Sequence, residues 1–242
     1  MKKLIGLLLG LTPIFSMANV TISPLEVILT PQKRTAEVIV VNTKNTKETY
    51  RLSLVDKAML HNGSMVDKSG LDSAMGNVFI TPREITLNGK GTQTVRVMLR
   101  NAKSLQDGEY KTHLTLRHIP ENLTQNKSPS GDALSMSITP KYGISIPVFV
   151  QIGKLALTAK IDSVKVVGKE AIVQMSYSGN RSLRGQVNLY QGNTLVGSMK
   201  NAAIYKSIDF RTFVIPLNNK YINGRSIKVE YIDKYTKVKT IN

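Results

Sequence analysis

The side chains that most often carry catalysis or bind metals are few in this 242-residue sequence, and their spacing suits neither role. There is no cysteine, which excludes disulfides, thiolate metal ligands and a cysteine nucleophile. The histidines are His61, His113 and His118, and the closest two are five residues apart in a predicted strand-to-turn region. An odd spacing in a strand puts side chains on opposite faces. We therefore predict no metal site and no cofactor.

Two short motifs lack the context that their chemistry needs. Residues 88–91, Asn-Gly-Lys-Gly, have the composition of a phosphate-binding loop, but no strand–loop–helix pattern surrounds them, so we predict a hairpin turn. Residues 178–182 join two predicted strands and have Gly-Asn turn chemistry. They lack the serine flanked by glycines of a nucleophile elbow, so we predict a turn here too. No general acid/base pair suggests itself, because carboxylates lie mostly in turns or at strand ends, as at Asp56, Asp67, Asp72, Asp107 and Asp132. We predict that the protein is not an enzyme.

The most distinctive segment, residues 133–148, alternates apolar and other residues. The apolar side chains fall on even numbers: Leu134, Met136, Ile138, Pro140, Tyr142, Ile144, Ile146 and Val148. In an extended strand these side chains share one face. Pro140 and Pro147 cannot donate ladder hydrogen bonds, which indicates an edge strand with one side open. Such a strand either covers the core of its own domain or pairs with a foreign chain by strand addition.

The elements that must position this segment are strands. Runs rich in Val, Ile, Thr and Tyr alternate apolar with polar residues, and we predict strands at residues 36–41, 50–55, 93–99, 110–117, 135–151, 161–167, 171–177, 186–190, 210–216 and 226–232. Their spacing predicts an all-β chain of two β-sandwiches of roughly 100 residues each. We place the domain boundary at Gly153-Lys154, so the first domain covers residues 19–152 and the second 153–242. Residues 121–132 are predicted to be a polar loop.

The N-terminus has the pattern of a secretory signal peptide, residues 1–18. Lys2 and Lys3 precede an apolar stretch, residues 4–15, and Ser16-Met17-Ala18 supplies the small residues of a cleavage site. The apolar stretch is too short to span a bilayer, and no later segment is long and apolar enough. We expect a mature protein that is soluble outside the cytoplasm.

The chain is strongly basic, with 33 Lys and Arg against 16 Asp and Glu and a formal charge of +17. Loss of Lys2 and Lys3 with the signal peptide leaves +15. Because an exported protein does not meet chromosomal DNA, we expect no nucleic-acid partner. The charge favours anionic envelope lipids, acidic polypeptides or free carboxylates, and a merely soluble surface is the alternative.

Five motifs occur in one order along the first half, at residues 19–24 (NVTISP), 34–42 (RTAEVIVVN), 82–96 (Pro82, Leu87 and QTVR), 108–120 (GEYKTHL and RHIP) and 144–148 (ISIPV). In this order they resemble the periplasmic chaperones of chaperone-usher pilus assembly, the PapD-like family, although Gly89-Lys90 stands where the family has Pro-Gly. The second half is a weaker match, centred on residues 177–182.

The resemblance implies two immunoglobulin-like β-sandwich domains and no catalytic chemistry. It implies a periplasmic chaperone that binds and stabilises pilus or fimbrial subunits by donor-strand complementation and delivers them to an outer-membrane usher. By this analogy the subunit-binding side chains are Leu134, Met136, Ile138, Pro140, Ile144 and Ile146.

One departure concerns how a subunit's C-terminus is held. The family usually binds that carboxylate with an Arg on the first strand and a Lys on the donor strand. In this chain Glu26 falls at the Arg position, and no residue from Tyr142 to Ser145 is basic where the Lys is expected. Either another cation takes the role, with Lys141 and Arg83 as candidates, or the C-terminus is held differently, or the protein no longer serves pilins.

The alternative function is an exported structural or adhesive surface component that uses the same edge strand to polymerise or to bind a polymer. Self-association without a separate subunit would favour it. A hydrolase on a sandwich scaffold lacks support, because neither a nucleophile–base pair nor a metal cluster is apparent in the sequence.

Overall fold

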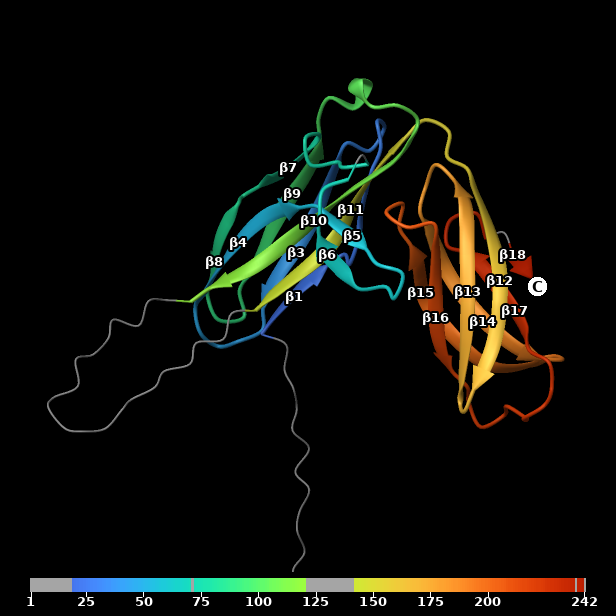
Figure 1. The fold of residues 1–242 in the computed structure, drawn as a ribbon. Helices are drawn as coiled ribbons and strands as arrows, with labels where there is room; N and C mark the ends of the chain where they lie inside the picture. The colour runs from blue at the N-terminus through green and yellow to red at the C-terminus, as the bar shows by residue number, and fades with distance from the viewer. Residues whose placement is uncertain (1–18, 71, 121–141, 238, 242) are drawn as a thin grey trace, which may run out of the picture.

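The computed structural model describes residues 19–70, 72–120, 142–237 and 239–241. The all-β prediction is confirmed, because these residues form strands that pack as two β-sandwiches, one from each half of the chain (Figure 1). None of the described residues forms a helix long and apolar enough to cross a membrane.

The first sandwich packs a four-stranded sheet against a five-stranded sheet. The four-stranded sheet has the order β1 (Val20–Ser23), β3 (Thr35–Asn42), β9 (Thr92–Leu99) and β7 (Val78–Thr81). The five-stranded sheet has the order β2 (Val27–Leu29), β11 (Gly143–Ile152), β10 (Gly108–Ile119), β4 (Glu48–Val55) and β8 (Glu84–Leu87). Neighbouring strands are antiparallel except β2 and β11, which are parallel. Alternate side chains such as Val38, Val95 and Leu114 fill the core between the sheets.

Two short elements lie outside these sheets. β5 (Lys57–Met59) and β6 (Met65–Asp67) form an antiparallel hairpin of their own, and a short 3-10 helix, η1 (Ala102–Ser104), follows β9. In Figure 1 the hairpin projects from the first sandwich toward the second.

The second sandwich packs a three-stranded sheet against a four-stranded one. The first has the order β12 (Leu157–Val167), β13 (Glu170–Gly179) and β16 (Phe210–Pro216). The other has the order β15 (Thr194–Ile204), β14 (Leu183–Gln191), β17 (Lys228–Asp233) and β18 (Lys239–Ile241). Val173, Leu189, Phe213 and Tyr231 belong to the core between them.

The structure corrects one predicted turn. Residues 88–91 do form a turn, in which the Gly91 N–H donates to the Asn88 carbonyl at 2.9 Å. It is not a hairpin, because β8 and β9 belong to different sheets and the chain crosses from one layer of the sandwich to the other. Of the predicted strand at residues 135–151, the described part begins at Gly143, and residues 135–141 lie outside the described ranges.

The connection between the sandwiches is short and hydrogen-bonded. It runs from the end of β11 at Ile152 to the start of β12 at Leu157, with Gly153 at a φ of 61°. The Asn180 side chain accepts from the Ala156 N–H at 2.8 Å and donates to the Lys154 carbonyl at 2.9 Å. The linker is therefore tied to the turn that follows β13.

Candidate functional site

The outer edge of β11 is open along half of the strand. β10 pairs with the whole of β11, from Gly108 opposite Ile152 to Arg117 opposite Gly143. On the other side, β2 pairs with residues 148–150 alone. Among the described residues, positions 143–147 have no strand on that side, and Pro147 has no N–H to donate. This stretch has the edge geometry that strand addition requires.

Two predicted binding residues lie on this stretch and already contact the protein's own core. Ile146 is 2% exposed and belongs to the core of the first sandwich, and Ile144 packs against that core. Both therefore stabilise the strand that carries the open edge. The predicted side chains nearer the N-terminus, Leu134, Met136, Ile138 and Pro140, lie outside the described residues.

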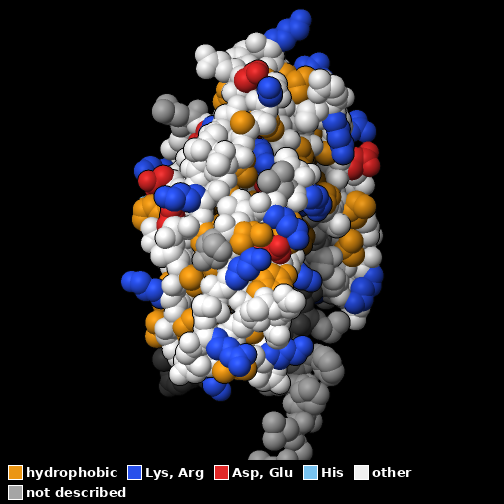
Figure 2. Space-filling model, turned by 90° about the vertical axis from the view of Figure 1, so that its right-hand side faces the viewer, with side chains coloured by type: hydrophobic (Ala, Val, Ile, Leu, Met, Phe, Trp, Pro, Cys, Tyr) orange, Lys and Arg blue, Asp and Glu red, His pale blue; other side chains and the backbone are white. Residues whose placement is uncertain are grey.

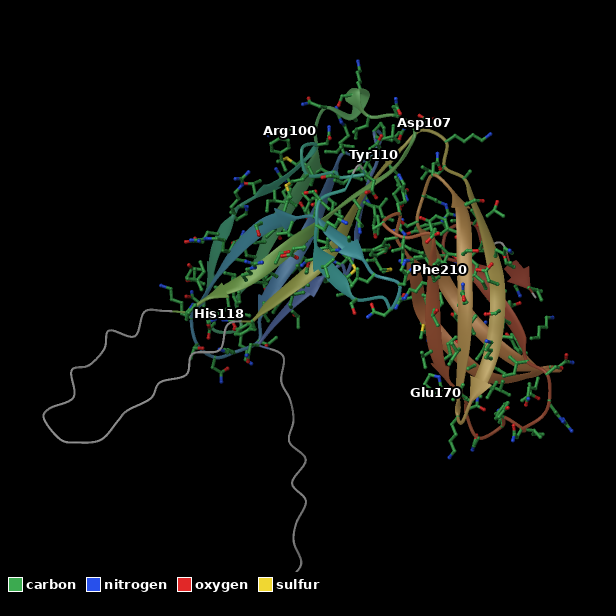
Figure 3. The ribbon with its side chains drawn as sticks, in the orientation of Figure 1. Arg100, Asp107, Tyr110, His118, Glu170 and Phe210 are labelled. Carbon is green, nitrogen blue, oxygen red and sulfur yellow. The ribbon has the colours of Figure 1, made fainter. Side chains whose placement is uncertain are left out.

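A polar cluster fixes the start of β11 to the end of β10. The His118 N–H donates to the Tyr142 carbonyl at 3.0 Å, and the two rings stack with centroids 4.6 Å apart. The His118 Nε2 contacts a carboxylate oxygen of Glu48, which also pairs with Lys44 at 2.8 Å. Figure 3 shows His118 at the end of the first sandwich farthest from the second. The open edge therefore begins from an anchored residue.

A second cluster joins the sandwiches around Arg184 of β14. Its guanidinium forms an ion pair with Glu109 of β10, lies over the Phe149 ring at 3.5 Å from the centroid, and approaches Glu26 at 3.6 Å. Glu109 also accepts from the Gln151 side chain at 2.9 Å and from the Ser182 N–H at 3.0 Å. Since Arg184 and Glu109 are both buried, this ion pair is shielded from solvent.

Glu26, which stands where the resemblance expects an arginine, belongs to this cluster. Besides Arg184, it pairs with the Lys234 ammonium and accepts from the Tyr235 hydroxyl at 3.4 Å. Two cations from the second sandwich thus neutralise its carboxylate. Glu26 holds the two sandwiches together and is not available to bind a partner's terminal carboxylate, which its own charge would repel.

A cavity of about 500 Å³ lies beside this cluster, between the sandwiches. Its lining combines lysines and carboxylates from the first sandwich, among them Asp56, Lys57 and Lys111, with Lys206 and Ser207 from the second. Lys111 is buried, donates to the Lys57 carbonyl at 2.7 Å and lies 4.3 Å from the centroid of the Tyr205 ring. Burial lowers the pKa of Lys111 to about 8. An anion reaching this cavity would meet a poorly solvated cation.

The β5–β6 hairpin forms the second bridge between the sandwiches. The Met59 N–H donates to the Ser207 hydroxyl at 2.8 Å, and the His61 ring stacks on Phe210 with centroids 4.1 Å apart. Phe210 lies on the side of the second sandwich that faces the first (Figure 3). Gly63, at a φ of 88°, packs against the Arg211 guanidinium in the space where a side chain would stand. The hairpin also supplies Lys57 and Ala58 to the cavity wall.

Of the two predicted anchor candidates, the structure describes only Arg83. Arg83 lies between β7 and β8, where its carbonyl accepts from the Leu52 N–H at 2.7 Å. β8 is at the opposite edge of the five-stranded sheet from β2, so Arg83 is remote from Glu26 and from the cavity. Lys141 lies outside the described residues.

Sequence reasoning missed Lys111 and Arg184. The available signal was the row of polar side chains at odd positions of β10, Glu109, Lys111 and His113, where the even positions from 108 to 116 carry no charged side chain. That row predicts a polar face, yet all three side chains are buried, because the hairpin and the second sandwich cover them. Among the described residues, no group of three His, Cys, Asp or Glu side chains could hold a metal ion.

One family model matches the first half of the chain. Residues 19–151, more than half of the chain, match the model of the pili and flagellar-assembly chaperones, PapD N-terminal domain. No curated protein sequence matches the chain.

Solved chaperone structures share the whole architecture at low sequence identity. The YadV chaperone is 15% identical, with a TM-score of 0.53 over 93% of this chain and 98% of that one. The E. coli chaperone DraB is 14% identical, with a TM-score of 0.52 over 91% of this chain and 92% of that one. A chain of the CsuC–CsuE chaperone–tip adhesion subunit pre-assembly complex of Acinetobacter baumannii is 13% identical, with a TM-score of 0.53 over 93% of this chain and 97% of that one. At these identities the likeness shows the fold, two immunoglobulin-like sandwiches.

Proposed function

This chain belongs to the family of pili and flagellar-assembly chaperones, and on that premise we propose that it binds pilus or fimbrial subunits by donor-strand complementation and delivers them to an outer-membrane usher. The observation that carries the proposal is the open edge of β11 at residues 143–147. A subunit strand can pair there through backbone hydrogen bonds. The apolar side chains of residues 134–140, which precede that edge in the chain, then fill the groove of the subunit.

The proposal includes the location and the domains. The chain is exported by a signal peptide, residues 1–18, and acts in the periplasm, with a chaperone domain at residues 19–152 and a second sandwich domain at 153–242. We assign it no catalytic role. We name a subunit and an usher as partners because the chain belongs to this family. In support, one structurally similar chain comes from the CsuC–CsuE complex of a chaperone with a tip adhesion subunit.

Lys111 is the cation that we assign to the terminal carboxylate of a subunit. It is buried and lines the cavity between the sandwiches, where desolvation disfavours its charged form and lowers its pKa. A terminal carboxylate bound beside it would stabilise the charged form, in addition to the nearby Asp56, Asp72 and Glu109. Glu26 already pairs with Arg184 and Lys234, which leaves the usual position without a free cation. Lys141 stays a prediction.

The test is co-expression of the full chain with candidate subunits from the same organism, followed by purification from the periplasm. We expect a one-to-one complex that Ile138→Asp abolishes, because a charge would enter the apolar groove of the subunit. Ser137→Asp is the matched control, since it adds the same charge at the neighbouring position, which an extended strand turns to the other face.

The anchor is tested on the same complex. Lys111→Ala should weaken it, whereas Lys68→Ala, which removes an exposed lysine from the same cavity wall, should not. If the wild-type protein elutes alone or self-associated, and Ile138→Asp changes nothing, the chaperone proposal fails and a structural or adhesive surface component becomes the better reading.

A further inference from the structure

The end of the second sandwich farthest from the linker is formed by three turns. They are residues 165–170, which include the end of β12 and the start of β13, residues 191–196, which include the end of β14 and the start of β15, and residues 216–228, from the end of β16 to the start of β17. Together we call them the distal tip. Strand pairing sets this position, because Leu157 opposite Gly179 is at the linker end of β12 and Val167 opposite Glu170 is at the other. Figure 3 shows Glu170 at this end.

Hydrogen bonds make the three turns one continuous surface. The Leu217 N–H donates to the Lys169 carbonyl at 2.8 Å, and the Asn218 N–H donates to the Val196 carbonyl at 2.8 Å. The Gln191 side chain accepts from the Ile222 N–H at 2.9 Å. The backbones of the three turns are therefore held in a fixed arrangement.

Each turn of the distal tip exposes a large apolar side chain. Val167 is 61% exposed, Ile222 is 49% exposed and Leu195 is 42% exposed. None of them belongs to the core of the second sandwich. Exposed apolar side chains that gather at one end of a domain indicate a contact surface more than isolated ones do.

The charge of the distal tip is strongly positive. Five exposed cations lie on its turns, Lys165, Lys169, Lys220, Arg225 and Lys228, against one carboxylate, Glu170, so the net charge is +4. In Figure 2 blue side chains outnumber red ones on the visible face, and blue and orange side chains lie together at its lower end. A surface of this kind attracts an anionic partner that also accepts apolar groups.

The distal tip is convex and uncovered. Gly168, Gly192 and Gly224 stand in its three turns at positive φ, and the space where each would carry a Cβ is empty to 4 Å. A rigid protein partner would need a concave surface matching three projecting turns. A fluid bilayer adapts to them, and the cations can contact its phosphates while the apolar side chains enter the interface.

We propose that the distal tip binds anionic phospholipid bilayers peripherally. Lys165, Lys169, Lys220, Arg225 and Lys228 lie at the level of the headgroups, and Val167, Leu195 and Ile222 reach the boundary with the acyl chains. This surface is at the opposite end of the second sandwich from the cavity, so the protein can hold a subunit and a membrane at once. The inference is independent of the subunit-binding proposal.

The test is flotation of the chain from Asn19 onward with lipid vesicles, because residues 1–18 are apolar and would themselves bind lipid. All described elements of both sandwiches lie within that chain. We expect binding to vesicles of equal parts phosphatidylglycerol and phosphatidylcholine and none to phosphatidylcholine alone. Lys169→Gln/Lys220→Gln should weaken binding by roughly twenty-fivefold, about fivefold for each cation removed. Added salt should weaken it further.

The matched control is Lys33→Gln/Lys103→Gln, which makes the same change in net charge at exposed positions of the first sandwich. We expect it to bind like the wild type. Equal losses in both double variants would overturn the proposal, since binding would then follow net charge alone. Failure to bind anionic vesicles, with or without binding to an acidic polypeptide such as polyglutamate, would also overturn it.

A tryptophan reporter locates the contact, because the chain contains no tryptophan. Brominated acyl chains should quench Val167→Trp in anionic vesicles and leave Ile39→Trp, at an exposed position of β3, unquenched. Quenching of the second reporter alone would assign the contact to the first sandwich and reject the distal tip.

Discussion

At the scale of single residues, Arg184 joins the sandwiches through contacts with Glu26, Glu109 and Phe149. Arg184→Ala would leave Glu109, which is 1% exposed, as a buried carboxylate without its cation. We expect a loss of about 3–5 kcal/mol in the free energy of unfolding, measured by urea denaturation. Arg51→Ala is the control, since it breaks an exposed pair with Glu84 and should cost less than about 1 kcal/mol. Equal costs for the two variants would contradict the role given to Arg184.

His113 makes stability depend on pH. Burial lowers its pKa to about 3, and the nearby Lys111 and Lys57 act in the same direction. In the unfolded chain the pKa is about 6.5. Between these values the unfolded state binds a proton that the folded state does not, so stability is lost as the pH falls from about 6.5 toward 3.

We expect the wild type to lose about 2 kcal/mol more than His113→Gln between pH 7.5 and pH 5, since each pKa unit corresponds to about 1.4 kcal/mol. Urea denaturation of both proteins at the two pH values measures the difference. Parallel losses would mean that His113 is not kept neutral by the fold.

At the scale of elements, the β5–β6 hairpin depends on Gly63. Gly63→Val would place a branched side chain at a φ of 88° and into the Arg211 guanidinium, which costs about 1–3 kcal/mol in backbone strain alone. We expect the hairpin to leave the second sandwich, with faster hydrogen exchange at the Met59 and Thr212 amides that bond across the contact.

The control for this prediction is Gly76→Val. Gly76 has no positive φ, and a Cβ there would meet open space. Exchange at Met59 and Thr212 should stay slow in that variant. Slow exchange in Gly63→Val as well would show that Arg211 yields to a side chain and that the contact survives.

The sequence pattern predicted the long strands and missed elements whose pattern is broken or short. β15 was not predicted, because Gly197 interrupts its alternation and its pairing with β14 shifts register twice, with Asn201 at a φ of 56°. The three-residue strands β5 and β6 are too short for a period to appear. The turn at residues 88–91 was predicted correctly, but the prediction that it closes a hairpin was wrong. Turn residues do not reveal which sheet the next strand joins.

The candidate site was predictable only where it is local. The open edge at residues 143–147 followed from alternation and from Pro147, whereas the pairing of β2 with residues 148–150 on the same side of the strand was not predicted. Arg184 and Glu109 are 75 residues apart, and no periodicity links them. The partners of Glu26 were hidden for the same reason, since Lys234 is 208 residues away in the chain.

At the scale of the whole molecule, two separate bridges flank the cavity and hold the sandwiches together, the Arg184 cluster and the hairpin. We expect each of Arg184→Ala and Gly63→Val to keep the overall shape, because the other bridge remains. The double variant should open, with a larger maximum dimension in small-angle X-ray scattering of the chain from Asn19 onward. An equally large increase in maximum dimension in either single variant would show that the other bridge alone cannot hold the two sandwiches together.

The parallel strand β2 has one more consequence. It occupies the edge of β11 at residues 148–150, directly after the open stretch. An incoming strand that runs along β11 must stop there, whatever its length or sequence. β2 therefore sets an upper limit on the length of strand that this edge can accept, because backbone pairing along β11 cannot extend past Pro147.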